Sequence, residues 1–229
     1  MQGFSDPNVV TDVKLSNLRD SLRENIDIIK VSPLFEAITQ TIRDHGLKIT
    51  KIRCVALGSP SQEEPALYQL GLLQLLIEQL NIEPHNVSLF DPVFNKLDLR
   101  VFADEKYVIE DEYPPLEQDL DETLFFLPHS PLDLTEDIIR EQKPRILLGN
   151  NLETHTERLT RSEIYVKYPT LAKLINILAA DPTRKVGANT DGFQTFTTKN
   201  KRNRAPKYRF VEPTLDYSVI KSYFDQVHM

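Results

Sequence analysis

Short apolar runs alternate with longer helical patterns along this chain, and this alternation constrains the fold more than any other feature. The runs are KIRCVALGS (51–59), NVSLFD (86–91), KYVIED (106–111), TLFFLPH (123–129) and PRILLGNN (144–151). Runs without polar alternation indicate strands that are buried on both faces, as in parallel sheets. The sequence therefore predicts an α/β, Rossmann-like three-layer fold: a mostly parallel sheet with helices on both faces.

Helical patterns separate these runs, and some of their starts carry capping signals. Ser32 is placed to cap the second helix. Asp91 is placed to cap the fourth helix. The start of the third helix has two readings: Ser61 and Glu64 match a capping box, whereas Pro65 favours a start one residue before it. The expected helices cover residues 11–29, 33–45, 65–80, 92–104, 131–142, 169–178 and 215–227.

Length and composition favour one globular domain. The 229 residues carry a net charge of −7, which argues against a nucleic-acid surface spread over the whole molecule. One cysteine, no secretory signal pattern and no apolar run long enough to cross a bilayer lead us to expect a cytoplasmic or nuclear protein without membrane contact. We expect a single domain over 1–229: a core over 47–180, N-terminal helices over 1–46 that pack on it, and a loop and C-terminal helix over 181–229.

Polar residues follow the predicted strands and are expected to meet. Ligands of doubly wound sheets bind at the carboxyl ends of the strands, where the strand order reverses. A 3-2-1-4-5 order would bring Gly58, Asp91, His129 and Asn150 to one rim. Each also has a purely structural reading: a tight turn for the glycine, a helix cap for the aspartate, and turn hydrogen bonds for the histidine and the asparagine.

Familiar catalytic patterns are missing from the sequence. A dinucleotide fingerprint needs three glycines, but only Gly58 is present, and Glu63 and Glu64 stand where an anion would dock. The sequence is more compatible with a methyltransferase-like site, in which Asp91 would bind a ribose. There is no Walker loop and no G-x-S-x-G elbow, and no residues have diagnostic metal-ligand spacing, so we expect no metal. Cys54 lies in mid-strand and reads as an inert core thiol.

One stretch departs from the acidic composition. KNKRNRAPKYR (199–209) carries six basic side chains and no acidic one. A nuclear-localisation or nucleic-acid patch is one reading, and a solvated loop is the favoured one.

Four blocks resemble the Sensitivity-to-Red-light-Reduced (SRR-like) domain family. They are LGSPSQEEPALYQLGLLQLL, FDPVFNKLD, TLFFLPHSP and ILLGNN, and the chain looks like a fungal member. The match is good over 54–151. The family often has cysteine where this chain has Ser130, which argues against His–Cys ligation of a metal or haem. The ligand-binding residues that position and resemblance imply are Gly58, Ser59, Tyr68, Gln69, Asp91, Pro92, His129, Ser130, Gly149, Asn150 and Asn151.

The resemblance implies a regulatory protein and no settled catalytic activity or cofactor. Family members are linked to microtubule-related processes, to regulation of haem synthesis and to circadian timing. We therefore expect a regulatory protein that engages a small-molecule ligand or protein partners. Two other readings stay open: a nucleotide- or S-adenosylmethionine-dependent transferase with His129 as acid or base, and a scaffold that binds proteins through helical surfaces.

Overall fold

Five parallel strands form a single sheet in the computed structural model, which describes residues 12–116 and 118–180. The strand order is β3-β2-β1-β4-β5, so the strand order reverses between β1 and β4. The predicted fold class is confirmed, and the sheet has the 3-2-1-4-5 order on which the prediction of a common rim depended. The strands are β1 (Lys51–Val55), β2 (Val87–Phe90), β3 (Val108–Ile109), β4 (Thr123–Leu127) and β5 (Ile146–Gly149).

The central strand, β1, determines what faces each side of the sheet. Cys54 is paired with Leu89 of β2 and with Phe126 of β4. Because successive side chains of a strand point to opposite faces, Cys54 and its neighbour Arg53 belong to different layers of the molecule.

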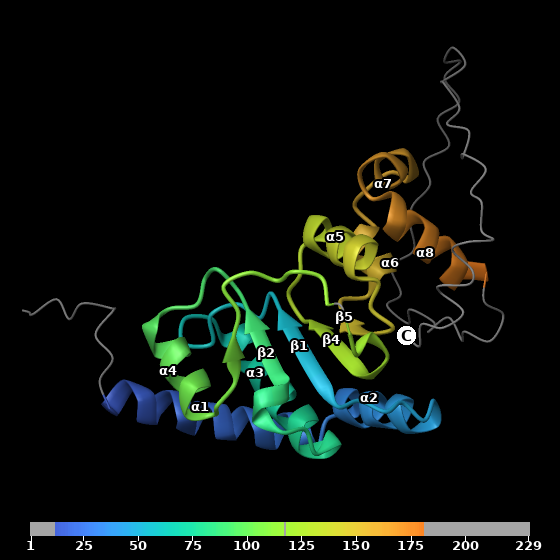
Figure 1. Cartoon of the computed structure of the whole chain (residues 1–229). Helices are drawn as coiled ribbons and strands as arrows, with labels where there is room; N and C mark the ends of the chain where they lie inside the picture. Colours follow the sequence, from blue (N-terminus) through green and yellow to red (C-terminus); the bar gives the residue numbers. More distant parts are fainter. Residues whose placement is uncertain (1–11, 117, 181–229) are drawn as a thin grey trace, which may run out of the picture.

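One face is covered by the first four helices, and its core is apolar. In Figure 1, α1 and α2 run along the lower side of the sheet. The buried leucines of α1 and α3 join Phe102 of α4 and alternate side chains of the strands in one large cluster. These helices are α1 (Asp12–Lys30), α2 (Pro33–Asp44), α3 (Glu64–Leu80) and α4 (Lys96–Asp104).

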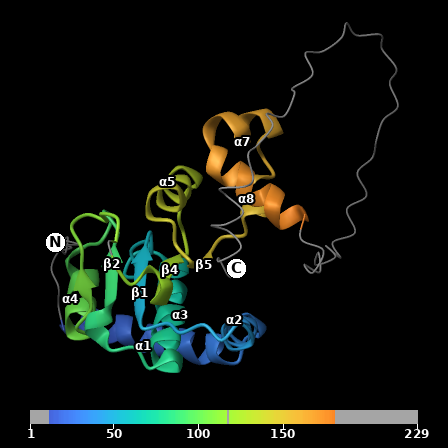
Figure 2. The ribbon, with the colours of Figure 1, turned by 45° about the vertical axis from the view of Figure 1, so that its right-hand side comes forward.

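The second face is covered by α5 and by the helices that follow it. Ile138 of α5 packs on Phe125 and Leu127 of β4, and α8 packs on the outer side of α5 (Figure 2). Glu136 is buried on α5 and accepts hydrogen bonds from two backbone N–H groups in the first turn of α8. The helices of this layer are α5 (Leu132–Gln142), α6 (Leu152–Thr156), α7 (Arg161–Lys167) and α8 (Pro169–Ala180).

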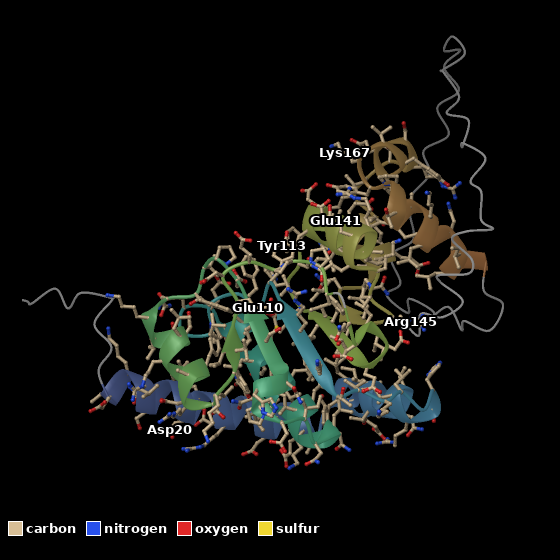
Figure 3. The ribbon with its side chains drawn as sticks, in the orientation of Figure 1. Asp20, Glu110, Tyr113, Glu141, Arg145 and Lys167 are labelled. Atoms are coloured by element: carbon tan, nitrogen blue, oxygen red, sulfur yellow. The ribbon has the colours of Figure 1, made fainter. Side chains whose placement is uncertain are left out.

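A segment between β3 and β4 covers the rest of this second face, and a buried arginine holds it there. The guanidinium of Arg53 donates to Glu110 at 2.7 Å, to the carbonyl of Pro114 at 2.7 Å and to Gln142 at 2.9 Å. Gln142 in turn donates to the carbonyl of Tyr113. Glu110 and Tyr113 are labelled in Figure 3. The short 3-10 helices Pro84–Asn86 and Leu120–Glu122 precede β2 and β4.

Two details of the helix boundaries differ from the predictions. Helix α4 begins at Lys96 instead of residue 92, and Asn95 caps it in a capping box with Asp98, so the prediction of Asp91 as the cap is wrong. The reason is that Asp91 accepts hydrogen bonds from the N–H groups of Gly58 and Val93, which both lie outside α4. Two short helices, α6 and α7, were not predicted.

Other boundaries agree with the sequence signals. Ser32 caps α2 by accepting from the N–H of Phe35. Helix α3 starts at Glu64, the residue before Pro65, so the proline reading was the correct one of the two. The expected C-terminal helix over 215–227 and the basic stretch 199–209 lie outside the described residues.

Candidate functional site

The predicted rim lies at the carboxyl ends of β1 and β4, where the strand order reverses. One backbone hydrogen bond joins the two chain segments there: the N–H of His129 donates to the carbonyl of Ala56 at 3.1 Å. Ala56 has a positive φ of 61°, an uncommon conformation for a residue with a side chain, so the chain turns sharply as it leaves β1. The predicted rim is therefore formed by two loops that are connected to each other.

Gly58 and Asp91 meet on the β1 side of the rim. The N–H of Gly58 donates to Asp91 Oδ2 at 2.8 Å, and the N–H of Val93 donates to Asp91 Oδ1 at 3.1 Å. Gly58 has a φ of +79°, and a Cβ added to it would stand 3.0 Å from the Cβ of Ala66 on α3. Both the backbone conformation and the space thus require glycine here.

A buried polar network holds the next residues of the same loop. Asp98 is fully buried and accepts from Ser59 Oγ at 2.6 Å, from the N–H of Ser61 at 2.9 Å and from the N–H of Asn95 at 3.1 Å. The side-chain amide of Asn95 donates to both serine hydroxyl groups, at 2.9 and 2.7 Å. The loop between β1 and α3 is therefore fixed by the start of α4.

These contacts place the protein's own carboxylates where a nucleotide fold would place a phosphate. Loops of that kind bind phosphate through backbone N–H groups at the start of the helix that follows β1. Here the N–H groups of Gly58 and Ser61 are already bound to Asp91 and Asp98. A carboxylate oxygen of Glu63 also lies 3.6 Å from the position of a Cβ on Gly58. The loop is thus built to exclude an anion.

The β4 side of the rim presents His129 to solvent. His129 is exposed, whereas its neighbour Ser130 is buried and accepts a hydrogen bond from Thr135 at 2.9 Å. Asn150 Nδ2 donates to the carbonyl of Ser130 at 3.5 Å, a long contact that links the end of β5 to this loop. The histidine therefore projects from a loop that is held on both sides.

The remaining predicted residues have separate surroundings. Gln69 of α3 donates to the carbonyl of Pro128 at 3.4 Å. Tyr68 is half-buried against the large apolar cluster, and Pro92 is exposed. Asn151 caps α6 by accepting from the N–H of Thr154. Gly149 lies so close to β4 that a Cβ on it would stand 3.1 Å from the carbonyl oxygen of Leu127.

The predicted residues thus form two groups. The first contains Gly58, Ser59 and Asp91; the second contains His129, Ser130 and Asn150, with Gln69 attached through Pro128. Within 12–116 and 118–180, no hydrogen bond joins the imidazole of His129 to the carboxylate of Asp91. That these residues bind a ligand stays a prediction.

The structure adds Asn95 and Asp98 to the site. The sequence reading placed both inside a helix that was expected to begin at residue 92. Their signal was present, because an asparagine followed three residues later by an aspartate has the spacing of a capping box. The same aspartate then bonds to the loop after β1, which cannot be read from local sequence.

Two further observations concern the kind of chemistry. Cys54 is fully buried, and burial followed by the nearby charge of Asp91 raises the pKa of its thiol far above the ordinary value. Among the described residues there is no group of three or more His, Cys, Asp or Glu side chains placed to hold a metal ion.

In the part of the chain that the structure describes, no helix is both long and apolar enough to cross a membrane.

Comparison with known proteins identifies the family. The SRR1 domain model matches residues 22–215, which is most of the chain and extends beyond the 54–151 blocks on both sides. No solved structure matches the chain. Because the family model covers the whole sheet, both rim loops and all but the first turns of α1, the resemblance is confirmed over more of the chain than the motif blocks indicated. The chain belongs to the SRR1 domain family.

Proposed function

We propose that this chain is a non-catalytic regulatory protein of the SRR-like family that recognises a ligand or partner at the rim between β1 and β4. The observation that carries the proposal is the state of the loop after β1. Its backbone donors are bound to Asp91 and Asp98, so the loop supports a rigid rim instead of a phosphate cradle.

The alternative of a nucleotide- or S-adenosylmethionine-dependent transferase has less support. That reading needs Asp91 to accept from a ribose, but each of its oxygens already accepts from a backbone N–H. It also needs a base near the reacting atoms, and the exposed His129 has no hydrogen-bonded partner that would orient its ring among the described residues.

The histidine is well placed for recognition. Its loop is tied to β1 through Ala56 and to α5 through Ser130 and Thr135, while the imidazole faces solvent. A polar group that is presented from a rigid loop loses little conformational entropy when it binds. We infer that this recognition takes place in the cytoplasm or nucleus and serves one of the processes to which the resemblance links family members: microtubule-related processes, haem-synthesis regulation or circadian timing.

The test replaces His129 with alanine in cells that lack the native protein and scores growth in the presence of a microtubule-depolymerising drug. His85→Ala is the matched control, because His85 is also exposed but lies in the short helix before β2. We expect His129→Ala to behave like the deletion and His85→Ala to behave like wild type, at equal protein levels. A normal drug response of His129→Ala would show that this process does not depend on the rim histidine.

A ligand panel separates the two readings in vitro. Binding to the native state raises stability by RT ln(1 + [L]/Kd), so a ligand at a hundred times its Kd adds about 2.7 kcal/mol. We expect no rise in Tm with ATP or S-adenosylmethionine at 1 mM, on the order of a hundred times a 10 µM Kd. A rise that His129→Ala abolishes would favour the transferase.

A further inference from the structure

A concave surface lies beside the loop between β1 and α3. It is a groove of about 440 Å³ between α1, the loop before α3 and the start of α4. Its volume is within the usual range for sites that take a small molecule or a few side chains. The groove shares the segment 60–64 with the rim loop but does not contain His129.

The floor of this groove is apolar. Leu18 of α1 and Leu67 of α3 are more than nine-tenths buried but line the groove, together with Leu97 and Pro60. The aliphatic part of a side chain that lay on this floor would leave water, and the burial of its CH₂ groups would stabilise the contact.

One wall is rigid. Asn95 donates to the hydroxyl of Ser61 and is itself fixed as the cap of α4. Asp98 holds the backbone of the same serine at 2.9 Å. The wall therefore needs no rearrangement before it receives a ligand, which lowers the cost of binding.

The mouth of the groove carries two acidic side chains. Glu63 and Glu64 are exposed, and neither forms an ion pair with another described residue. Lys14 of α1 also lines the groove. An ammonium or guanidinium group at the mouth would meet these carboxylates while its aliphatic stem lay on the leucine floor. Arginine and lysine side chains have this combination of an apolar stem and a charged end.

We propose that the groove binds an arginine- or lysine-bearing segment of a partner protein. The basic side chain lies on Leu18, Leu67 and Leu97, and its charged end binds Glu63 and Glu64. The assignment follows from charge complementarity, since the charged residues that line the groove are two glutamates and one lysine, Lys14. This interaction does not use His129, although the groove shares the segment 60–64 with the rim loop.

The experiment measures binding of a fluorescein-labelled hexapeptide of alternating arginine and leucine to the full-length protein by fluorescence anisotropy. The double substitution Glu63→Gln and Glu64→Gln should weaken binding at least tenfold. Asp111→Asn with Glu112→Gln changes the net charge equally at two exposed positions outside the groove, and should weaken it less than twofold. Equal losses in the two variants would mean general attraction to an acidic protein and would overturn the proposal.

Two tryptophan substitutions on α1 test whether the peptide binds in this groove. Ser21 and Ser16 are both exposed on α1, but only Ser21 lines this groove. Ser21→Trp fills the groove without altering the core and should abolish binding, whereas Ser16→Trp should bind like wild type with an unchanged Tm. Binding that survives Ser21→Trp, or no binding by the wild type at 1 mM peptide, on the order of a weak interaction, contradicts the proposal.

The chain's own basic stretch is the competing occupant. If Arg202→Gln with Arg204→Gln strengthens peptide binding fivefold or more, the groove is taken by residues 199–209 and the assignment to a partner protein is wrong. Unchanged binding in that variant supports the partner. Failure of the His129→Ala test leaves these outcomes unaffected, so the two proposals are tested separately.

Discussion

Arg53 and Cys54 are neighbours on β1, yet they lie in layers of opposite character. The thiol of Cys54 is enclosed by an apolar cluster of helices and strands. The guanidinium of Arg53 is equally buried, but it binds a carboxylate, a carbonyl oxygen and a side-chain amide. One face of the sheet is therefore closed by packing, and part of the other is closed by a hydrogen-bonded segment.

The difference shows how a face without a full helix layer can still be covered. The segment after β3 has few apolar side chains and seven acidic ones between residues 110 and 122. Three of its side chains, Tyr113, Leu116 and Leu120, pack against the apolar cluster on this face. Arg53 adds a polar attachment, because its several donors satisfy groups on the segment and on α5 at once.

The largest effect should come from removing that attachment. Arg53→Met keeps an apolar stem but leaves Glu110, Gln142 and the carbonyl of Pro114 without their donor. Breaking a buried ion pair at one partner costs about 3–5 kcal/mol. Urea unfolding should show a loss in this range, whereas Ile52→Val on the apolar face should cost only about 1 kcal/mol. A loss below that of the valine variant would mean that the segment is held by other contacts.

The turn after β1 should show the next largest effect. Gly58→Ala combines a positive φ with a Cβ 3.0 Å from the Cβ of Ala66, so we expect a loss of about 2–3 kcal/mol. Gly46→Ala is the matched control: Gly46 also has a positive φ, but nothing lies within 4 Å of the added atom. That variant should lose about 1 kcal/mol by the same denaturant titration. Equal losses would show that α3 moves away without cost.

The buried thiol of Cys54 on the apolar face leads to a prediction about how stability depends on pH. Because burial raises the pKa of Cys54 in the folded state, the thiol ionises more easily in the unfolded chain. The stability it contributes is complete below the unfolded pKa of about 8.5 and is lost above it by about 1.4 kcal/mol per pH unit. Urea midpoints between pH 8 and 10 should fall more steeply for the wild type than for Cys54→Ala. Parallel curves would contradict the raised pKa.

The smallest effect is expected at the outer end of the segment 110–122 that Arg53 holds. Lys51 pairs with Asp119 at 2.6 Å, but both side chains are 43% or more exposed. Exposed pairs contribute at most about 1 kcal/mol and are screened by salt. Lys51→Gln should therefore lower the free energy of unfolding by less than this. A loss near that of Arg53→Met would mean that the outer pair, and not the buried arginine, holds the segment.

Much of the fold could be predicted from sequence because local and global signals agree. The apolar runs indicated the strands, and their alternation with helices indicated a parallel sheet; the 3-2-1-4-5 order, which was assumed for the rim, is the order that the sheet has. The run KIRCV was read as uniformly apolar, which hid the role of Arg53. Its partners lie 57 and 89 residues away in the chain, and no local pattern records such contacts.

The positions of the candidate residues were predictable in outline but less so in detail. The rim lies where the strand order predicts, and Gly58 meets Asp91 there. The contribution of Asp98 was missed because it acts across the molecule on Ser59 and Ser61. The short helices α6 and α7 were missed because five and seven residues carry too little periodicity to be distinguished from loops.

The alternation on β1 also limits how this gene can vary. A single residue inserted before Arg53 would turn every later side chain of the strand to the other face. The guanidinium would then enter the leucine cluster without a partner, and the segment 110–122 would lose its anchor. Substitutions can be tolerated one position at a time, but the length of this strand is fixed by two neighbours that belong to different environments.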